Sequence, residues 1–279
     1  YSSAASDVYK RQLESDFKYV WSENNKYGKE MIFALLHETG NNAAEIACHF
    51  GPSDHPEVPG RWQYYGVSLP FWRSYDKEDP RREFFYYDYT GDAKRDDQSD
   101  YGFHYMVPEE GVTVVPNDTT KYMQNVATMK YTYDMISDAY YDGRTICIFR
   151  LSDVILCKAE IENNLNGPAA ALPYLNQIRA RAGAPEYGKH NRFPAPSTKE
   201  AMNDAILKER GYELVFEFQR RADLIRFGKY EEVVNAHLKK LGIAQPTNVT
   251  SSLRYFPYPL NDAQLNPNLA AENPSRLPK

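Results

Sequence analysis

The sequence predicts a mostly α-helical protein built on helical hairpins, with long irregular loops and short strands between them. In residues 150–183, RLSDVILCKAEIENNLNGPAAALPYLNQIRARAG, apolar residues recur every three or four positions, as one buried helical face requires. Asn166-Gly167 interrupts this pattern, and Pro168 can begin a second helix because its missing N–H costs nothing in the first turn. Gly183 then offers a C-cap. Such a hairpin cannot bury its apolar faces alone, so more helices must pack beside it.

The remaining elements follow from the same signals of periodicity and capping. Ser197 with Glu200 fits a capping box that begins a helix running through Phe218. Leu13–Asn24 is expected to finish a helix, and the apolar run Met31–Leu36 is expected to be a buried strand. The apolar residues expected to form the buried faces of the hairpin are Leu151, Val154, Ile155, Ala159, Leu172, Leu175 and Ile178.

The domain organisation is predicted to be simple. Residues 13–279 contain no independent linker and are interpreted as one domain. Within it, residues 60–126 are rich in aromatic residues and Asp and show few regular periods, so we expect an insert of long loops and short strands. A loop region of this length usually has a function. Residues 1–12, YSSAASDVYKRQ, resemble a translated adaptor sequence or a disordered linker, and we expect them not to contribute to the fold.

Composition and motif content exclude several classes of function. The net charge of −5 argues against a nucleic-acid partner, which favours a basic surface. No run of about 18 apolar residues occurs, so no segment is expected to span a bilayer. The three cysteines are too few for a disulfide framework, and Cys157 is expected to be a small buried residue. No zinc-like His/Cys spacing and no HExxH, GxSxG, GxGxxG or P-loop motif is present, so neither a metal nor a cofactor is expected.

Three segments in the last half of the chain resemble, in order, the motifs of one family. The hairpin matches "R-x-S-D-V-x-L-x-x-A-E" followed by "A-x-x-x-L-N-x-I-R-x-R-A-G". Residues 206–228, ILKERGYELVFEFQRRADLIRFG, resemble "I-x-x-E-R-x-x-E-L-x-F-E-x-x-R-x-x-D-L-x-R-x-G". Residues 255–274, YFPYPLNDAQLNPNLAAENP, are similar to "P-x-P-x-x-E-x-x-x-N-P-x-L-x-Q-N-P". The chain therefore resembles the C-terminal portion of the SusD/RagB family of outer-membrane nutrient-binding lipoproteins.

This resemblance implies a fold, a function and a location. The fold would be the C-terminal part of a SusD-like α-superhelix built from TPR-like hairpins. The protein would be non-catalytic, would bind oligosaccharides or polysaccharides on the outer face of the cell outer membrane, and would deliver them to a TonB-dependent, SusC-like transporter. Family members begin with a lipoprotein signal and a lipidated Cys, so membrane attachment would use a lipid anchor that is absent from this sequence.

Aromatic residues are the candidate ligand-binding groups. The chain has 23 Tyr against 15 Gly, and many rings cluster between Arg61 and Tyr105. Sugar rings stack their C–H faces on aromatic rings while their hydroxyls form hydrogen bonds, which suits Trp and Tyr. In the alternative interpretation, half or more of these rings form the core of the insert or face the transporter. The predicted platform consists of Trp62, Tyr64, Tyr65, Trp72 and Tyr75, with Arg73 and Asp76 as candidate hydroxyl partners.

Charged residues support two alternative functions. Glu209, Glu213 and Glu217 recur every four positions, and two of them could act as general acid and base in a glycoside hydrolase. The favoured interpretation is an ion-pair lattice with Arg179 and Arg181, because acids on a partly buried helix need cationic partners. The other alternative is a helical-repeat scaffold that binds only a protein partner.

Two shorter charged stretches are interpreted as solvated loop charges. One follows Trp72 and includes Asp79-Pro80-Arg81, which looks like a short "D-x-R" element of the family. The other could hold a hard cation through oxygen ligands but lacks the spacing of an EF-hand loop. Its acidic residues are Asp92, Asp96, Asp97 and Asp100.

Overall fold

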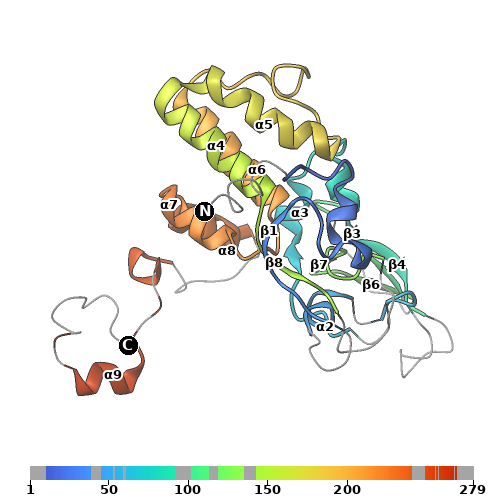
Figure 1. The fold of residues 1–279 in the computed structure, drawn as a ribbon. Helices are drawn as coiled ribbons and strands as arrows, with labels where there is room; N and C mark the ends of the chain where they lie inside the picture. Colours follow the sequence, from blue (N-terminus) through green and yellow to red (C-terminus); the bar gives the residue numbers. More distant parts are fainter. Residues whose placement is uncertain are drawn as a thin grey trace. The chain divides into compact units, whose positions relative to one another are not determined.

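Figure 1 shows a computed structural model of the chain, which divides into two compact units at the boundary between Glu217 and Phe218. This boundary falls inside the segment that the sequence predicts as a single helix. Most of residues 1–12 lie outside the described part. The structure describes residues 11–38, 45–52, 54–58, 61–91, 102–112, 119–134, 143–240, 249–254, 256, 258–266 and 268.

Three helices that lie side by side form the helical part of the first unit: α4 (Leu151–Asn166), α5 (Pro168–Ala182) and α6 (Lys199–Glu213) (Figure 1). The predicted hairpin is confirmed. Gly167, with φ of 89°, separates α4 from α5, and Pro168 begins α5. Gly183, with φ of 73°, ends α5 by donating its N–H to the carbonyl of Ala180 at 3.1 Å. The prediction of a mostly helical chain is also confirmed.

The face that α4 buries differs from the prediction at Val154. Ile155 and Ala159 are buried as expected, but Val154 is 49% exposed. Ile161 and Leu165 are also exposed, so α4 carries apolar residues on two faces, and the sequence period alone does not tell which one is covered. Cys157 is only half-buried. Its Sγ lies 3.6 Å from a guanidinium nitrogen of Arg210 on α6.

Helix α6 begins and ends at different residues from those predicted. Its N-cap is Thr198 rather than Ser197, because the Thr198 hydroxyl accepts a hydrogen bond from the N–H of Ala201 at 3.1 Å. The helix stops at Glu213 instead of continuing through Phe218. Phe216 and Phe218 have φ of 61° and 66°, left-handed conformations through which an α-helix does not continue.

The cap can be tested by substitution. Replacing Thr198 by alanine is expected to lower the free energy of unfolding by about 1 kcal/mol, because one N–H of the first turn of α6 loses its acceptor. Urea unfolding followed by circular dichroism measures this change. Ser197→Ala is the matched control and should leave stability nearly unchanged; the reverse order of effects would restore Ser197 as the cap.

The strands are short and form three small sheets within the described residues. Strand β1 (Met31–Leu35) pairs antiparallel with β8 (Ile146–Arg150). Strand β7 (Asn125–Thr128) lies between β2 (Val67–Ser68) and β3 (Phe85–Tyr86) and is antiparallel to both. Strand β5 (His104–Met106) lies between the antiparallel β4 (Asp88–Thr90) and the parallel β6 (Thr120–Tyr122). The prediction of short strands and loops in residues 60–126 is confirmed where this insert is described.

Two predictions near the start of the chain need correction. β1 is a strand, but only Met31 is buried, while Ile32, Phe33 and Leu35 are exposed. A two-stranded sheet with shifts in register covers little of its own surface, so an apolar run does not guarantee burial. The helix predicted to end in Leu13–Asn24 consists instead of two short 3₁₀ helices, η1 (Lys18–Trp21) and η2 (Glu23–Asn25).

Short helices complete the two units. In the first unit these are α2 (Ile46–Phe50), α3 (Leu69–Arg73) and the 3₁₀ helix η3 (Pro80–Glu83). The second unit contains α7 (Arg220–Arg226), α8 (Tyr230–Lys240), η4 (Ser251–Arg254) and α9 (Leu260–Leu265), and α7 packs on α8. Among the described residues, no helix has both the length and the apolar character needed to cross a membrane.

Candidate functional site

Three of the predicted platform residues, Trp62, Tyr64 and Tyr65, lie together at the surface beside His49 of α2. We call these four residues the aromatic cluster. The side chains of Trp62, Tyr64 and Tyr65 are 37%, 65% and 56% exposed. The ring centroids of Trp62 and Tyr64 lie 5.4 Å apart, and the His49 ring lies 5.2 and 5.4 Å from them. The sequence prediction missed His49, because no motif around it suggests that it meets these rings.

The backbone of the aromatic cluster is fixed on α2. The N–H of Trp62 donates to the carbonyl of Cys48 at 2.7 Å, and the N–H of Tyr65 donates to the carbonyl of His49 at 3.1 Å. Between them, Gln63 has φ of 49°, in the left-handed region, which costs a non-glycine residue about 1–3 kcal/mol. Such strain persists only where neighbouring contacts impose it, and it often marks functional turns. The exposed rings are therefore held in place by an ordered turn.

Trp72 and Tyr75 do not belong to an exposed platform, contrary to prediction. They are 4% and 3% exposed, in a core cluster that also contains Tyr212. The indole N–H of Trp72 donates to the carbonyl of Arg82 at 3.2 Å, and the Arg82 guanidinium lies 4.0 Å from the Trp72 ring centroid. Tyr75 stacks on Tyr212 with centroids 4.2 Å apart, and its burial raises the pKa of its hydroxyl. For these two rings the alternative interpretation, a place in the core, describes the structure.

The two polar residues predicted with the platform already have protein partners. Arg73 donates a hydrogen bond to the carbonyl of Pro108. The Asp76 carboxylate forms an ion pair with Arg192 at 2.8 Å and also accepts the N–H of Glu78 at 2.9 Å. Neither residue lies in the ring contacts of the aromatic cluster. The structure thus brings together only part of the predicted site.

Trp72, Arg73 and Tyr75 instead line a cleft with a volume of about 540 Å³, which we call the charged cleft. This volume lies within the range of about 300–1,000 Å³ that is typical of small-molecule sites. None of the aromatic cluster residues lines it. Its other lining residues are Lys77, Arg82, Tyr87, Asp88, Met106, Val107, Pro108, Glu109 and Glu110.

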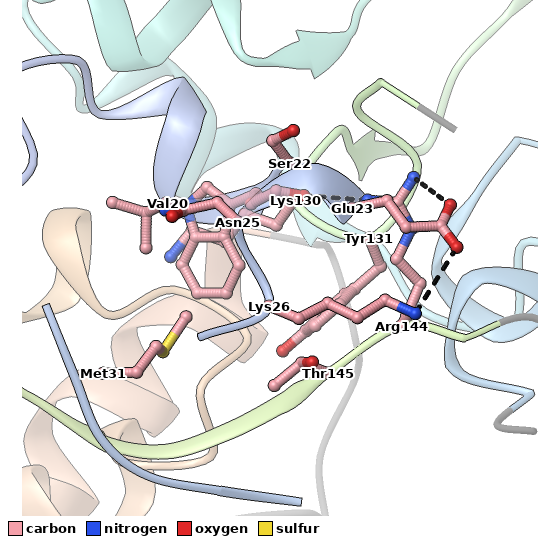
Figure 2. A pocket seen from close by; sticks show the side chains of 11 residues that line it. Val20, Ser22, Glu23, Asn25, Lys26, Met31, Lys130, Tyr131, Arg144 and Thr145 are labelled. Atoms are coloured by element: carbon pink, nitrogen blue, oxygen red, sulfur yellow. Dashed lines mark hydrogen bonds and ion pairs between the residues drawn. The ribbon is translucent and has the colours of Figure 1, made fainter. Parts of the chain in front are cut away.

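A second cavity, near η1 and η2, is too small for a sugar. Its volume is about 20 Å³, enough for a water molecule. Figure 2 shows its lining side chains, with Glu23 forming ion pairs to Lys26 at 3.8 Å and to Arg144 at 3.9 Å. The indole nitrogen of Trp21 and the hydroxyl of Thr145 have no hydrogen-bond partner among the described residues, so the cavity is suited to solvent.

The carboxylates considered for catalysis lie in a buried ion-pair lattice, as the favoured interpretation predicted. Glu209 pairs with Arg179 at 2.7 Å, and Glu213 pairs with Arg181. Glu217 pairs with Lys130 at 2.6 Å. All members of the lattice have side chains that are 5% exposed or less. They are Glu30, Asp79, Arg81, Lys130, Arg150, Arg179, Arg181, Glu209, Glu213 and Glu217.

The structure tests only one of the two shorter charged stretches that were predicted to be solvated. Asp79 and Arg81 are each 2% exposed, so the interpretation as solvated loop charges is wrong for this pair. Arg81 joins the lattice through Asp79 at 2.8 Å and Glu209 at 2.6 Å, partners that local sequence does not reveal. The stretch from Asp92 to Asp100 lies outside the described residues. Within the described residues, no three His, Cys, Asp or Glu side chains are grouped to hold a metal ion.

The lattice should make the protein unstable in acid. Burial alone would raise the pKa of Glu30 and Glu213, but Arg150 and Arg181 outweigh this effect and hold both pKa values below the ordinary 4.5. Because the unfolded chain binds protons more readily, this stabilisation is present above about pH 4.5 and is lost as the pH falls further. Urea midpoints measured from pH 7 to pH 3 should therefore drop below pH 4.5. Urea midpoints that stay constant over this pH range would contradict the stabilising role of the lattice. Glu213→Gln should make the fall of the midpoint below pH 4.5 less steep.

A comparison with known proteins gives three results. The model of the SusD family matches residues 30–275. SusD-like protein P25 of Formosa agariphila is 39% identical over 120 residues, which cover 43% of this chain and 22% of that protein. The starch-binding protein SusD of Bacteroides thetaiotaomicron is 28% identical over 137 residues, which cover 48% of this chain and 22% of that protein.

A solved structure has a similar fold. Surface glycan-binding protein A from Bacteroides thetaiotaomicron, in complex with laminarihexaose, superposes with a TM-score of 0.62 at 20% identity. The match covers 92% of this chain and 54% of that protein. The chain thus spans about half of this structural neighbour and less than a quarter of the two curated relatives.

Proposed function

The chain belongs to the SusD family, and from this membership and the exposed rings we propose that it binds a glycan at the aromatic cluster without hydrolysing it. The observation that carries the proposal is the exposure of Trp62, Tyr64 and Tyr65 on an ordered turn. Exposed aromatic rings cost free energy in water, and stacking on the C–H face of a sugar recovers part of it. Fixed rings also lose little conformational freedom when they bind.

The related proteins support the same class of ligand. One is described as starch-binding, and another was solved as a surface glycan-binding protein in complex with laminarihexaose. By family resemblance we further propose that the complete protein is held at the outward face of the outer membrane by a lipid anchor. There it would deliver its glycan to a TonB-dependent, SusC-like transporter.

The charged residues give little support to the hydrolase alternative. A glycosidase needs two carboxylates that face a substrate cleft. Glu209, Glu213 and Glu217 are instead buried and paired with cations. A glycan-binding surface therefore accounts for more of the structure than a catalytic pair does.

Titration of the purified chain with a panel of soluble polysaccharides tests the proposal, with Trp fluorescence and released reducing sugar followed together. Saturable quenching without release of sugar is the expected result. Release of sugar would replace the proposal with a glycoside hydrolase. The absence of both signals from a folded sample would favour a scaffold that binds only a protein partner.

A further inference from the structure

We propose that the charged cleft is a second sugar-binding site, one that selects an uncharged sugar unit. This inference rests on the proposed glycan-binding function for its class of ligand. It uses a different set of residues from the aromatic cluster, so the two sites can fail separately.

The lining of the cleft contains both cations and carboxylates, which come from different segments of the chain. Arg73, at the end of α3, and Lys77 and Arg82, which follow it in the chain, supply cations. Glu109 and Glu110, in the loop after β5, supply carboxylates. A further carboxylate of the lining, Asp88, lies 2.6 Å from the ring nitrogen of His104.

Several of these groups are available to a ligand. Lys77, Glu109 and Glu110 form no ion pair with any residue that the structure describes. The Nε of Arg82 is buried and has no hydrogen-bond partner among the described residues, and the guanidinium is stacked on the Trp72 ring. The side chains of Lys77, Glu109 and Glu110 are exposed, so a ligand can reach them by displacing water.

A neutral sugar matches this arrangement. Each hydroxyl can both donate and accept, so one sugar unit can donate to Glu109 and Glu110 and accept from Lys77 and Arg82. A uronate or a sulfate ester would be attracted by the cations of the lining but repelled by its carboxylates. The Tyr87 ring, 5.2 Å from that of Trp72, adds an aromatic surface beside the polar groups.

A fluorescence experiment can separate the cleft from the aromatic cluster. In the Trp62→Phe variant the remaining tryptophans are the buried Trp21 and the cleft residue Trp72, so binding at the cluster no longer changes a nearby indole. This variant is titrated with laminarihexaose, maltohexaose and cellohexaose as neutral probes, and with hexagalacturonate as an anionic probe. At least one neutral probe should give a saturable change in Trp emission, and hexagalacturonate should bind at least tenfold more weakly.

Substitutions that remove charges then test whether the change in Trp emission comes from binding in the charged cleft. Lys77→Met combined with Glu110→Gln, in the Trp62→Phe background, should lower the affinity for the neutral probe at least tenfold. Lys158→Met with Glu162→Gln is the matched control, because it removes an ion pair at the surface of α4. It should leave the affinity for the neutral probe unchanged. No saturable signal from any neutral probe, equal binding of hexagalacturonate, or an unaffected double variant would each overturn the proposal.

The outcomes also distinguish this inference from the proposed function. If Trp62→Ala abolishes glycan binding while Lys77→Met with Glu110→Gln, made in the chain that keeps Trp62, binds normally, the cleft is not a sugar site and the proposed function stands. If Lys77→Met with Glu110→Gln loses binding in the chain that keeps Trp62, and Trp62→Ala retains it, the cleft is the sugar site and the aromatic cluster is not.

Discussion

Replacing Arg150 by methionine is expected to lower the free energy of unfolding by about 3–5 kcal/mol, the usual effect of removing one partner from a buried ion pair. Arg150 is fully buried and contacts Glu30 at 2.5 Å, Glu213 at 2.7 Å and Glu217 at 2.6 Å. The methionine side chain fills much of the space but leaves these carboxylates with too few cations. Urea unfolding at pH 7, followed by circular dichroism, measures the loss.

Arg192→Met is the matched control for this experiment. Arg192 also pairs with a carboxylate, Asp76, but its side chain is 47% exposed, and exposed pairs contribute about 0–1 kcal/mol. If the two substitutions lower the free energy of unfolding by equally small amounts, the lattice does not contribute substantially to stability. Glu217→Ala should likewise lower stability while leaving glycan affinity unchanged; lost binding at unchanged stability would instead give Glu217 a role in the ligand site.

Replacing Trp62 by alanine is expected to weaken glycan binding about 30-fold, because loss of a central aromatic contact commonly costs about 2 kcal/mol of binding free energy. The urea midpoint should change little, because the Trp62 side chain is 37% exposed and its backbone bond to Cys48 remains. Isothermal titration with the polysaccharide identified by the panel measures the affinity.

Tyr27→Ala provides the control for nonspecific loss of an exposed ring. Tyr27 is 78% exposed and makes no ring contact with the aromatic cluster. Its removal should leave the affinity unchanged. If Trp62→Ala binds as tightly as the Tyr27→Ala variant, the aromatic cluster is not the glycan site.

Local chemistry in the sequence was enough to predict the elements whose ends depend on one or two residues. Gly167 and Gly183 have positive φ angles, and Pro168 begins a helix, as their positions between periodic segments suggested. The pairing of Glu209 and Glu213 with Arg179 and Arg181 also followed from spacing along a helix and the cost of buried charge.

The exposure of the aromatic rings could not be predicted in the same way. Tyr75 is buried by packing against Tyr212, 137 positions later in the chain, and its hydroxyl donates to the carbonyl of that residue at 3.0 Å. Nothing in an irregular segment distinguishes such a ring from the exposed Tyr64, since both follow another aromatic residue within three positions. Arg81 was misjudged for the same reason, because its partner Glu209 is 128 positions away.

The ion-pair lattice also has a consequence for the rate and cooperativity of folding. It joins Glu30 to Arg150 across 120 positions and to Arg181 across 151. Contacts between distant segments form late, because the entropy of closing long loops is lost before the contacts stabilise the chain. A partly assembled lattice would also leave buried charges without partners. The first unit is therefore expected to fold slowly and in an all-or-none manner, with the charged lattice as one of the last parts to form.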